Sequence, residues 1–169
     1  MSIVLGIDPG VSGAIARLGG GGKYYWVEDM PTVLANKSSN RRMVSPADLS
    51  RILRTAMLDA DGDIQAITEN VASMPKQGVA SVFAFGKSYG ILLGSLAALG
   101  IPCHIVTPGK WKKHFALGAD KEQSRELAQR FWPLAPLNLK KHDGRAEALL
   151  LARFYVETMA VPAAETSAP

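Results

Sequence analysis

The chain has 169 residues, of which 47% are hydrophobic and 20% are charged, a composition that fits one globular domain and excludes disorder of the bulk of the chain. Nineteen Lys and Arg stand against fifteen Asp and Glu, so a formal net charge of +4 makes the protein only mildly basic. Its one cysteine, Cys103, excludes an internal disulfide and a cysteine-based zinc site.

Localisation is predicted from the absence of apolar targeting signals. No stretch reaches the roughly 18 uninterrupted apolar residues of a membrane span. The first residues, MSIVLGIDPG, also lack the order of a signal peptide. We therefore expect a cytoplasmic protein with no membrane partner. We expect residues 1–160 to form a single domain and residues 161–169 to be a flexible tail.

The first half of the chain predicts three strands, one helix and a fourth strand. Residues 2–8 (SIVLGID) and 13–18 (GAIARL) are short apolar runs around the turn PGVS, and residues 23–27 (KYYWV) follow a run of glycines. Ser45 is placed to cap a helix with Pro46 in its first turn, and apolar residues follow it at helical spacing. Residues 64–68 (IQAIT) then predict a short buried strand that ends at Glu69.

The second half predicts mainly helices. A long apolar helix covers residues 79–99 and is closed by Gly100, and residues 101–106 form a fifth strand. A short helix from residue 108 to residue 115 follows, then a helix over residues 121–132 with Asp120 as its cap, and a final helix over residues 144–159. This order predicts an α/β fold. Three antiparallel strands and two strands parallel to the first would form a five-stranded mixed sheet with helices on both faces.

Four carboxylates would meet at one edge of this sheet if the last helix packs against that edge. Asp8 and Glu69 end two strands that the topology makes parallel, and ligands bind outside the carboxyl ends of such strands. Asp143 and Glu147 lie four residues apart, hence on one face of the last helix. Hard oxygen ligands that crowd together favour Mg²⁺, or Mn²⁺ in its place. Two such ions would suit in-line displacement at a phosphodiester.

Each acid also has a purely structural interpretation. Asp8 could belong to the chemistry of the Asp-Pro-Gly turn, and Asp143 could cap the last helix. Glu147 could pair with Arg145 or Lys141, or interact with the dipole of its helix. Glu69 is harder to explain in this way, because no cation lies within six residues of it in the sequence.

Basic residues predict a polyanionic partner. Between Glu69 and Asp120 the chain carries five lysines and no carboxylate, and further cations lie before and after this stretch. Aromatic side chains in the same stretch offer stacking surfaces, although helical spacing places most of them in the core. The residues expected to bind DNA are Lys76, Arg41, Arg42, Lys110, Lys112, Lys113, Lys140, Lys141 and Arg145.

A stripe of small residues runs along the long helix. Gly86, Gly90 and Gly94 recur every four residues, each at a helix-propensity cost of roughly 1 kcal/mol relative to alanine. The stripe either packs against the protein's own sheet or forms a two-fold contact with the same helix of a second subunit. For the second case we name Phe83 with the three glycines as the dimer interface.

Five segments taken together resemble one enzyme family. They are GIDPGVSGA, ITEN, PKQGVASVFAFGKSYGILLGSLAALGIP, TPGKWKKHFAL and KKHDGRAEALLLA, and they span about residues 3–152. The chain resembles the RuvC-type Holliday junction resolvases of the RNase H-like superfamily. It is closest to the branch of phages and plant chloroplasts.

The resemblance implies a homodimer that makes paired symmetric nicks in a four-way DNA junction, with Mg²⁺, two ions per active site. Asp8, Glu69, Asp143 and Glu147 match the catalytic and metal-binding acids of the family. Lys112 and Lys121 match basic residues near the scissile phosphate. The chain departs from the bacterial pattern, in which the last two acids are three residues apart rather than four. In the chloroplast branch a histidine stands at the position of Asp143.

Three other functions are weighed against this one. GIDPGVSGA also resembles the phosphate loop of sugar kinases and actin-like ATPases, but 169 residues leave no room for their second domain. A junction-binding protein could keep the fold without the chemistry, although all four acids are present here. An RNase H-like or transposase-like nuclease would act on another nucleic acid.

Overall fold

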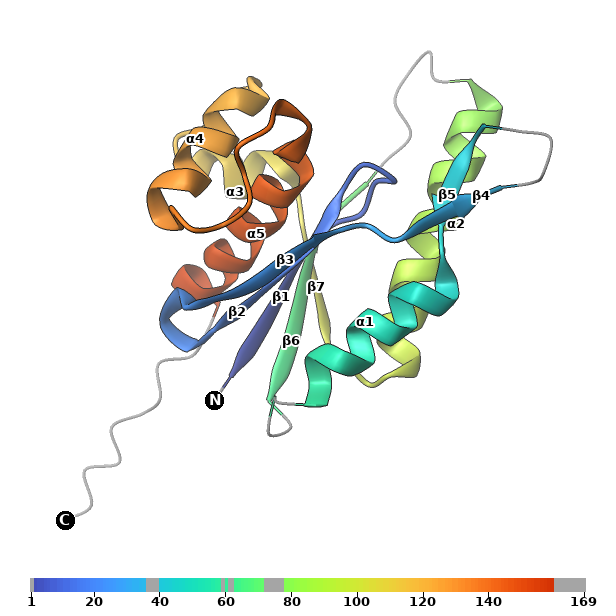
Figure 1. The fold of residues 1–169 in the computed structure, drawn as a ribbon, viewed down its shortest axis with the longest axis horizontal. Helices are drawn as coiled ribbons and strands as arrows, with labels where there is room; N and C mark the ends of the chain where they lie inside the picture. Colours follow the sequence, from blue (N-terminus) through green and yellow to red (C-terminus); the bar gives the residue numbers. More distant parts are fainter. Residues whose placement is uncertain (1, 36–39, 59, 61–62, 72–77, 160–169) are drawn as a thin grey trace.

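The computed structural model describes residues 2–35, 40–58, 60, 63–71 and 78–159. Its main sheet has the strand order β3-β2-β1-β6-β7, in which β1 pairs antiparallel with β2 and parallel with β6 (Figure 1). Strand β2 pairs antiparallel with β3, and β6 pairs parallel with β7. The predicted mixed sheet of three antiparallel and two parallel strands is therefore confirmed. Its strands are β1 (Ile3–Asp8), β2 (Ala14–Gly19), β3 (Tyr24–Asp29), β6 (Ile64–Glu69) and β7 (Cys103–Val106).

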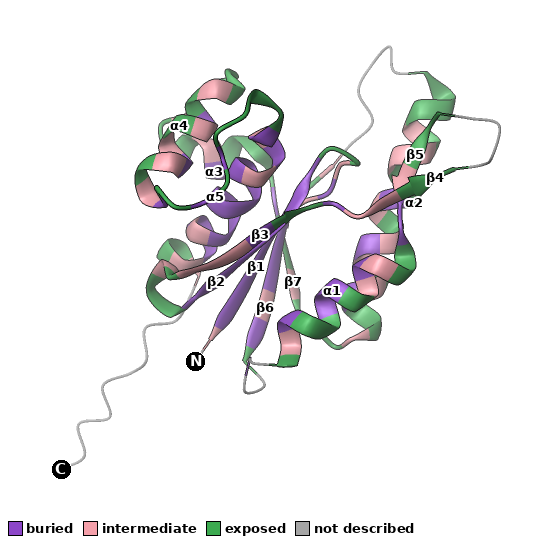
Figure 2. Ribbon diagram, viewed as in Figure 1, coloured by how far each residue is buried: buried purple, intermediate pink, exposed green. Residues whose placement is uncertain are grey.

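Helices cover both faces of this sheet, as the sequence predicts. Figure 1 shows α3, α4 and α5 on one face and α1 and α2 on the other. The three central strands β2, β1 and β6 are largely buried (Figure 2), and each face of the sheet has its own apolar core. The helices are α1 (Pro46–Leu58), α2 (Val79–Ala98), α3 (Pro108–His114), α4 (Lys121–Phe131) and α5 (Asp143–Thr158), with single 3₁₀ turns η1 (Gly20–Gly22) and η2 (Lys140–His142).

Helix ends follow the local signals of the sequence. Ser45 and Asp48 bond to one another at the start of α1, and the Asp120 carboxylate accepts the Glu122 backbone N–H at the start of α4. Gly100 ends α2 with a positive φ of 68°, a conformation that glycine adopts without strain. These three predicted boundaries are confirmed because capping depends on residues that are close in the sequence.

A small hairpin is an element that the sequence does not predict. Strands β4 (Thr32–Leu34) and β5 (Arg42–Val44) pair antiparallel beside α2 (Figure 1). The sequence NKSSNRR indicates only a polar segment, because strands of three residues are too short to show alternation. The predicted flexible tail, residues 161–169, lies outside the described residues.

Helix α2 contacts the core with only part of its surface. Leu92 and Leu96 are buried against the sheet, but only 17% of the most apolar part of this helix is buried. By length and composition alone, α2 is the one helix within the described ranges that could cross a membrane. Lys87 interrupts its apolar run, and a membrane is not needed to explain the helix, because an exposed apolar face also suits a protein contact. The absence of a membrane partner stays a prediction.

Candidate active site

Two acids end neighbouring parallel strands, as predicted. Strand β1 pairs with β6 up to Ile7 and Thr68, so Asp8 and Glu69 are the next residues on each strand. Pro9 follows Asp8 and ends the strand, because proline has no N–H to continue the ladder. Both carboxylates therefore start from the same edge of the sheet.

Close backbone contacts place the start of α5 over this edge. A Cβ atom on Gly144 would lie 2.5 Å from the carbonyl oxygen of Ser12, in the turn after β1. A Cβ atom on Gly6, within β1, would lie 2.0 Å from the carbonyl oxygen of Ala148. Only glycine permits such an approach of helix and strand. It brings the first turns of α5, and with them Glu147, to the end of β1.

The charges of three acids act on one another. Burial raises the pKa of Asp8 from 3.8 to about 7, and the nearby carboxylates of Glu147 and Glu69 contribute to this rise. A hydrogen bond from the Gly10 backbone and the positive charge of Lys121 act in the opposite direction on this pKa. Asp8, Glu69, Glu147 and Lys121 thus share one site, as the sequence predicts.

Helix α3 holds two of these acids through adjacent residues. The indole Nε1–H of Trp111 donates to Glu69 Oε1 at 2.6 Å, and Lys112 Nζ donates to Glu147 Oε1 at 3.2 Å. Burial raises the pKa of Glu69, whereas the Trp111 hydrogen bond and the charge of Lys112 lower it. The alternative that Glu147 pairs with Arg145 or Lys141 is wrong, because its partner comes from another helix.

Asp143 occupies a different part of the site. It is the first residue of α5, and the alternative that its side chain caps this helix is wrong, because the cap position belongs to His142. Its side chain lines a surface hollow with residues of α4 and η2, and Asp143 is not among the charges that raise the pKa of Asp8. The other lining residues are Asp120, Lys121, Glu122 and Lys140. The predicted role of Asp143 as a metal ligand remains a prediction.

The site suits a hard divalent cation in donor type and charge. Carboxylate oxygens are the preferred ligands of Mg²⁺, and the pKa of Asp8 is raised first by burial and then by the negative charges of Glu147 and Glu69. In the described part of the chain, no three Asp, Glu, His or Cys side chains are arranged to hold a metal ion as they stand. Lys112 instead supplies positive charge at Glu147.

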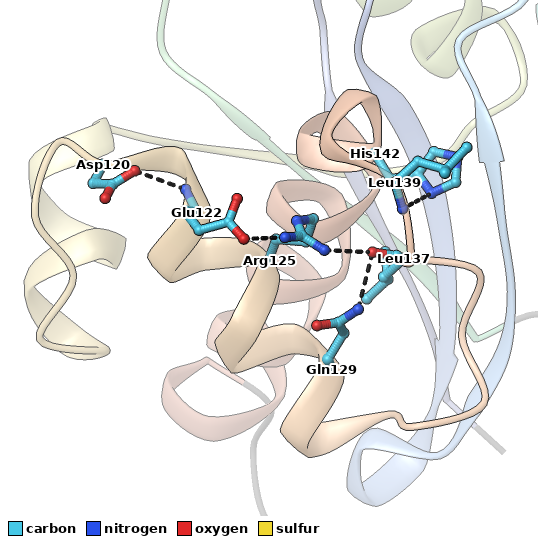
Figure 3. A network of polar contacts seen from close by, with 7 residues as sticks. All are labelled: Asp120, Glu122, Arg125, Gln129, Leu137, Leu139 and His142. Atoms are coloured by element: carbon cyan, nitrogen blue, oxygen red, sulfur yellow. Dashed lines mark hydrogen bonds and ion pairs between the residues drawn. The ribbon is translucent and has the colours of Figure 1, made fainter.

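A polar network fixes the segment that leads into α5. In Figure 3, Arg125 pairs with Glu122 on α4, and Arg125 and Gln129 both donate to the carbonyl oxygen of Leu137. The Leu139 backbone N–H then donates to Nδ1 of His142, the residue before α5. The network ties α4 to the loop before η2 and so supports the start of α5.

The residues predicted to bind DNA fall in several places. Lys110 and Lys113 are exposed on α3, and Lys140 and Lys141 are exposed in η2, next to Asp143. Arg145 is held by two bonds to Asp29 (2.6 and 2.9 Å) and one to Pro136, so it also has a structural role.

The other predicted cations lie on the far side of the sheet or outside the described residues. Arg41 and Arg42 are exposed at the β4–β5 hairpin, where the Arg42 guanidinium bonds to Thr32. Lys76 is outside the described residues. DNA binding by all nine cations stays a prediction.

The glycine stripe faces outward. A Cβ atom added to Gly86, Gly90 or Gly94 would meet no atom within 4 Å, and the Phe83 side chain is 75% exposed. The alternative that the stripe packs against its own sheet is therefore wrong. The dimer contact stays a prediction.

Sequence reasoning misses the partners of Glu69. Helical spacing places most aromatics of this stretch in the core without saying which, and Trp111 is one that is completely buried, with its N–H aimed at a carboxylate. The Tyr89 hydroxyl on α2 also donates to the backbone carbonyl of Glu69, at 3.2 Å. The one sequence feature that points to Trp111 as a residue of the site is its position directly before Lys112 in the segment TPGKWKKHFAL.

Among known proteins, solved structures are what support the fold of this chain. No family model matches the chain, and a search of curated proteins finds no match either. A solved structure described as Thermus thermophilus RuvC in complex with Holliday junction substrate aligns with a TM-score of 0.61 and 16% identity, over 93% of this chain and 96% of that one. A second T. thermophilus RuvC structure aligns with a TM-score of 0.55 and 16% identity, over 92% and 95% of the two chains. The likeness extends over nearly the whole of both proteins, and this chain therefore has the RNase H-like fold of RuvC.

Proposed function

We propose that this protein is a metal-dependent endonuclease that resolves four-way DNA junctions by paired symmetric nicks. The observation that carries the proposal is the cluster of Asp8, Glu69 and Glu147 at the carboxyl edge of a sheet with the RuvC fold. The RuvC structure that aligns with this chain was solved with a Holliday junction substrate, which supports the same class of DNA for this protein.

The acids have the chemistry for holding Mg²⁺, with Mn²⁺ as a substitute. Asp8, Glu69 and Glu147, joined by Asp143, would be the ligands. Bound metal supplies Lewis-acid activation of water and stabilises charge on the leaving oxygen. The lysines of the site would neutralise the incoming phosphate: Lys121 already acts on Asp8, and Lys112 would exchange Glu147 for a phosphate oxygen.

A homodimer explains the exposed face of α2. The helix is apolar, most of its surface is open, and its glycines would let two backbones approach closely. A two-fold contact uses the same patch on both subunits. Two symmetric active sites would match the two-fold symmetry of a junction and produce paired nicks.

Nick mapping on synthetic junctions tests this function. Wild-type protein with Mg²⁺ is expected to nick opposite strands of a four-way junction at symmetric positions, on both a mobile and an immobile core. Linear duplex and an RNA/DNA hybrid serve as controls and are expected to remain intact. Preferred cleavage of the hybrid would indicate an RNase H-like enzyme. Tight junction binding without nicks in Mg²⁺ or Mn²⁺ would indicate a binding protein that has lost the chemistry.

Salt dependence tests whether the exposed lysines of α3, Lys110 and Lys113, bind DNA. We expect junction affinity without divalent metal to fall by about 10³–10⁵ between 50 and 200 mM salt, as for a protein that neutralises 6–10 phosphates. A Lys110→Ala, Lys113→Ala double variant should lower the slope of log K against log[salt] by about 0.9 for each phosphate that it no longer neutralises. Lys23→Ala is the control, because Lys23 precedes β3 at the other end of the sheet. A slope that the double variant leaves unchanged would contradict DNA binding by α3.

A further inference from the structure

We propose that Trp111 is a positioning residue for Glu69, an inference that rests on the proposed nuclease function. Its indole N–H binds Glu69 Oε1 at 2.6 Å, and we assign metal binding to the other oxygen, Oε2. Trp111 would thus fix the orientation in which the Glu69 carboxylate receives the cation.

The indole is suited to this role because it cannot turn away. Trp111 is completely buried in the core between the sheet and α5, so packing fixes the direction of its N–H. A buried indole N–H needs an acceptor, and a hydrogen bond to a charged acceptor is roughly twice as strong as one between neutral groups. The bond to the Glu69 carboxylate, at 2.6 Å, is of this charge-assisted kind.

Glu69 is held at two points by two helices. Tyr89 on α2 bonds to its backbone carbonyl, and Trp111 on α3 bonds to its carboxylate. The next residue, Lys112, bonds to Glu147 on α5. One turn of α3 therefore fixes acids from β6 and α5 relative to each other. Hydrogen-bond partners of metal ligands typically contribute about 10–100-fold to metal affinity or activity.

Trp132 provides a matched control within the same protein. It is buried in the same core, and its Nε1–H also has an acceptor, but this is the backbone carbonyl of Gly22 at 3.1 Å. Trp111→Phe and Trp132→Phe each remove the same atoms and one hydrogen bond. A loss of stability from the disturbed core should be common to both variants. A loss of metal affinity or activity that acts through Glu69 should appear only in Trp111→Phe.

The experiment measures Mn²⁺ affinity by titration calorimetry without DNA, and then kcat and KM on a four-way junction. Trp111→Phe is expected to weaken Mn²⁺ binding and lower kcat by about 10–100-fold, with junction KM within about twofold of wild type. Trp132→Phe is expected to leave Mn²⁺ affinity and kcat unchanged, below the melting temperature of each variant. Trp111→Phe with wild-type Mn²⁺ affinity and kcat would overturn the proposal and leave the nuclease function intact.

A second variant covers the case in which Trp111→Phe does not fold. Benzothienylalanine placed at position 111 by suppression keeps the indole shape and replaces the N–H by sulfur. The same losses of about 10–100-fold are expected, and their absence would overturn the proposal. A wild-type protein that binds Mn²⁺ but cuts no junction would refute the proposed function alone, because the Mn²⁺ affinities still decide the role of Trp111. A wild type that binds no Mn²⁺ would refute both.

Discussion

Asp8→Asn is expected to abolish junction cleavage and, at pH 8, to raise the unfolding temperature of the metal-free protein. The loss of cleavage, at least about 10²–10³-fold, follows from removing one charge of the acid cluster. Glu69→Gln and Glu147→Gln should have the same effect on cleavage. Junction binding should persist or tighten in all three, because repulsion of phosphate falls while the basic surface is unchanged.

The gain in stability follows from the raised pKa of Asp8. In the folded protein this pKa is about 7, against an ordinary value of 3.8. Between these two pH values the folded state therefore holds a proton on Asp8 that the unfolded chain has lost. The contribution of protonated Asp8 to the free energy of unfolding is complete below about pH 4 and is lost as the pH rises through about 7. Ionising Asp8 in the fold then costs about 4 kcal/mol. Asparagine at position 8 has no such cost. Each kcal/mol that the variant gains in free energy of unfolding should raise the midpoint of thermal unfolding by about 2–4 °C.

Thermal melts at pH 5 and pH 8 in EDTA measure this effect. The difference between Asp8→Asn and wild type should be larger at pH 8, and Mg²⁺ should stabilise wild type more than the variant. Asp29→Asn is a control of opposite sign, because the hydrogen bond from Arg145 lowers the pKa of Asp29. That variant should melt lower at pH 8. An Asp8→Asn protein that melts below wild type at pH 8 would contradict the raised pKa that burial and the neighbouring acids give Asp8.

Gly90→Leu is expected to weaken dimerisation by roughly two to four powers of ten. Overpacking typically costs about 1–3 kcal/mol per site, and a two-fold contact contains the inserted side chain twice. At about 1.4 kcal/mol for each tenfold change, the doubled cost gives this range. The isolated subunit should tolerate the change, because a Cβ atom on Gly90 meets nothing within 4 Å and leucine favours helix more than glycine does.

Sedimentation equilibrium beside a thermal melt distinguishes an interface effect from a folding effect. The variant should shift to monomer while the monomer melts no lower than wild type. Gly109→Leu is a matched control, since Gly109 lies on α3 and its Cβ would also meet nothing within 4 Å. Unchanged dimerisation of Gly90→Leu would remove the stripe from the interface and direct the search to Phe83.

The sequence by itself determined the sheet and the acids at its edge. Caps, apolar periodicity and strand-ending turns act over a few residues, so the order of strands, the start of α4 and the end of α2 were predictable. Because parallel strands end at one edge, Asp8 and Glu69 could be placed together from the order of elements alone. The strands β4 and β5 could not be predicted, because a segment of three residues has no measurable period.

Only the tertiary structure decided which neighbours these residues meet. Helical spacing put Asp143 and Glu147 on one face of α5. In the fold, however, α3 packs close enough for Lys112 to form an ion pair with Glu147, whereas Asp143 lines the hollow beside α4. Likewise, helical periodicity placed most aromatics of the stretch around Trp111 in the core but could not show that the Trp111 N–H reaches Glu69, 42 positions away. The glycine stripe had two equally good interpretations until packing turned it outward. Spacing along a chain fixes which side chains share a face, whereas the partner of that face depends on long-range packing, which no local pattern encodes.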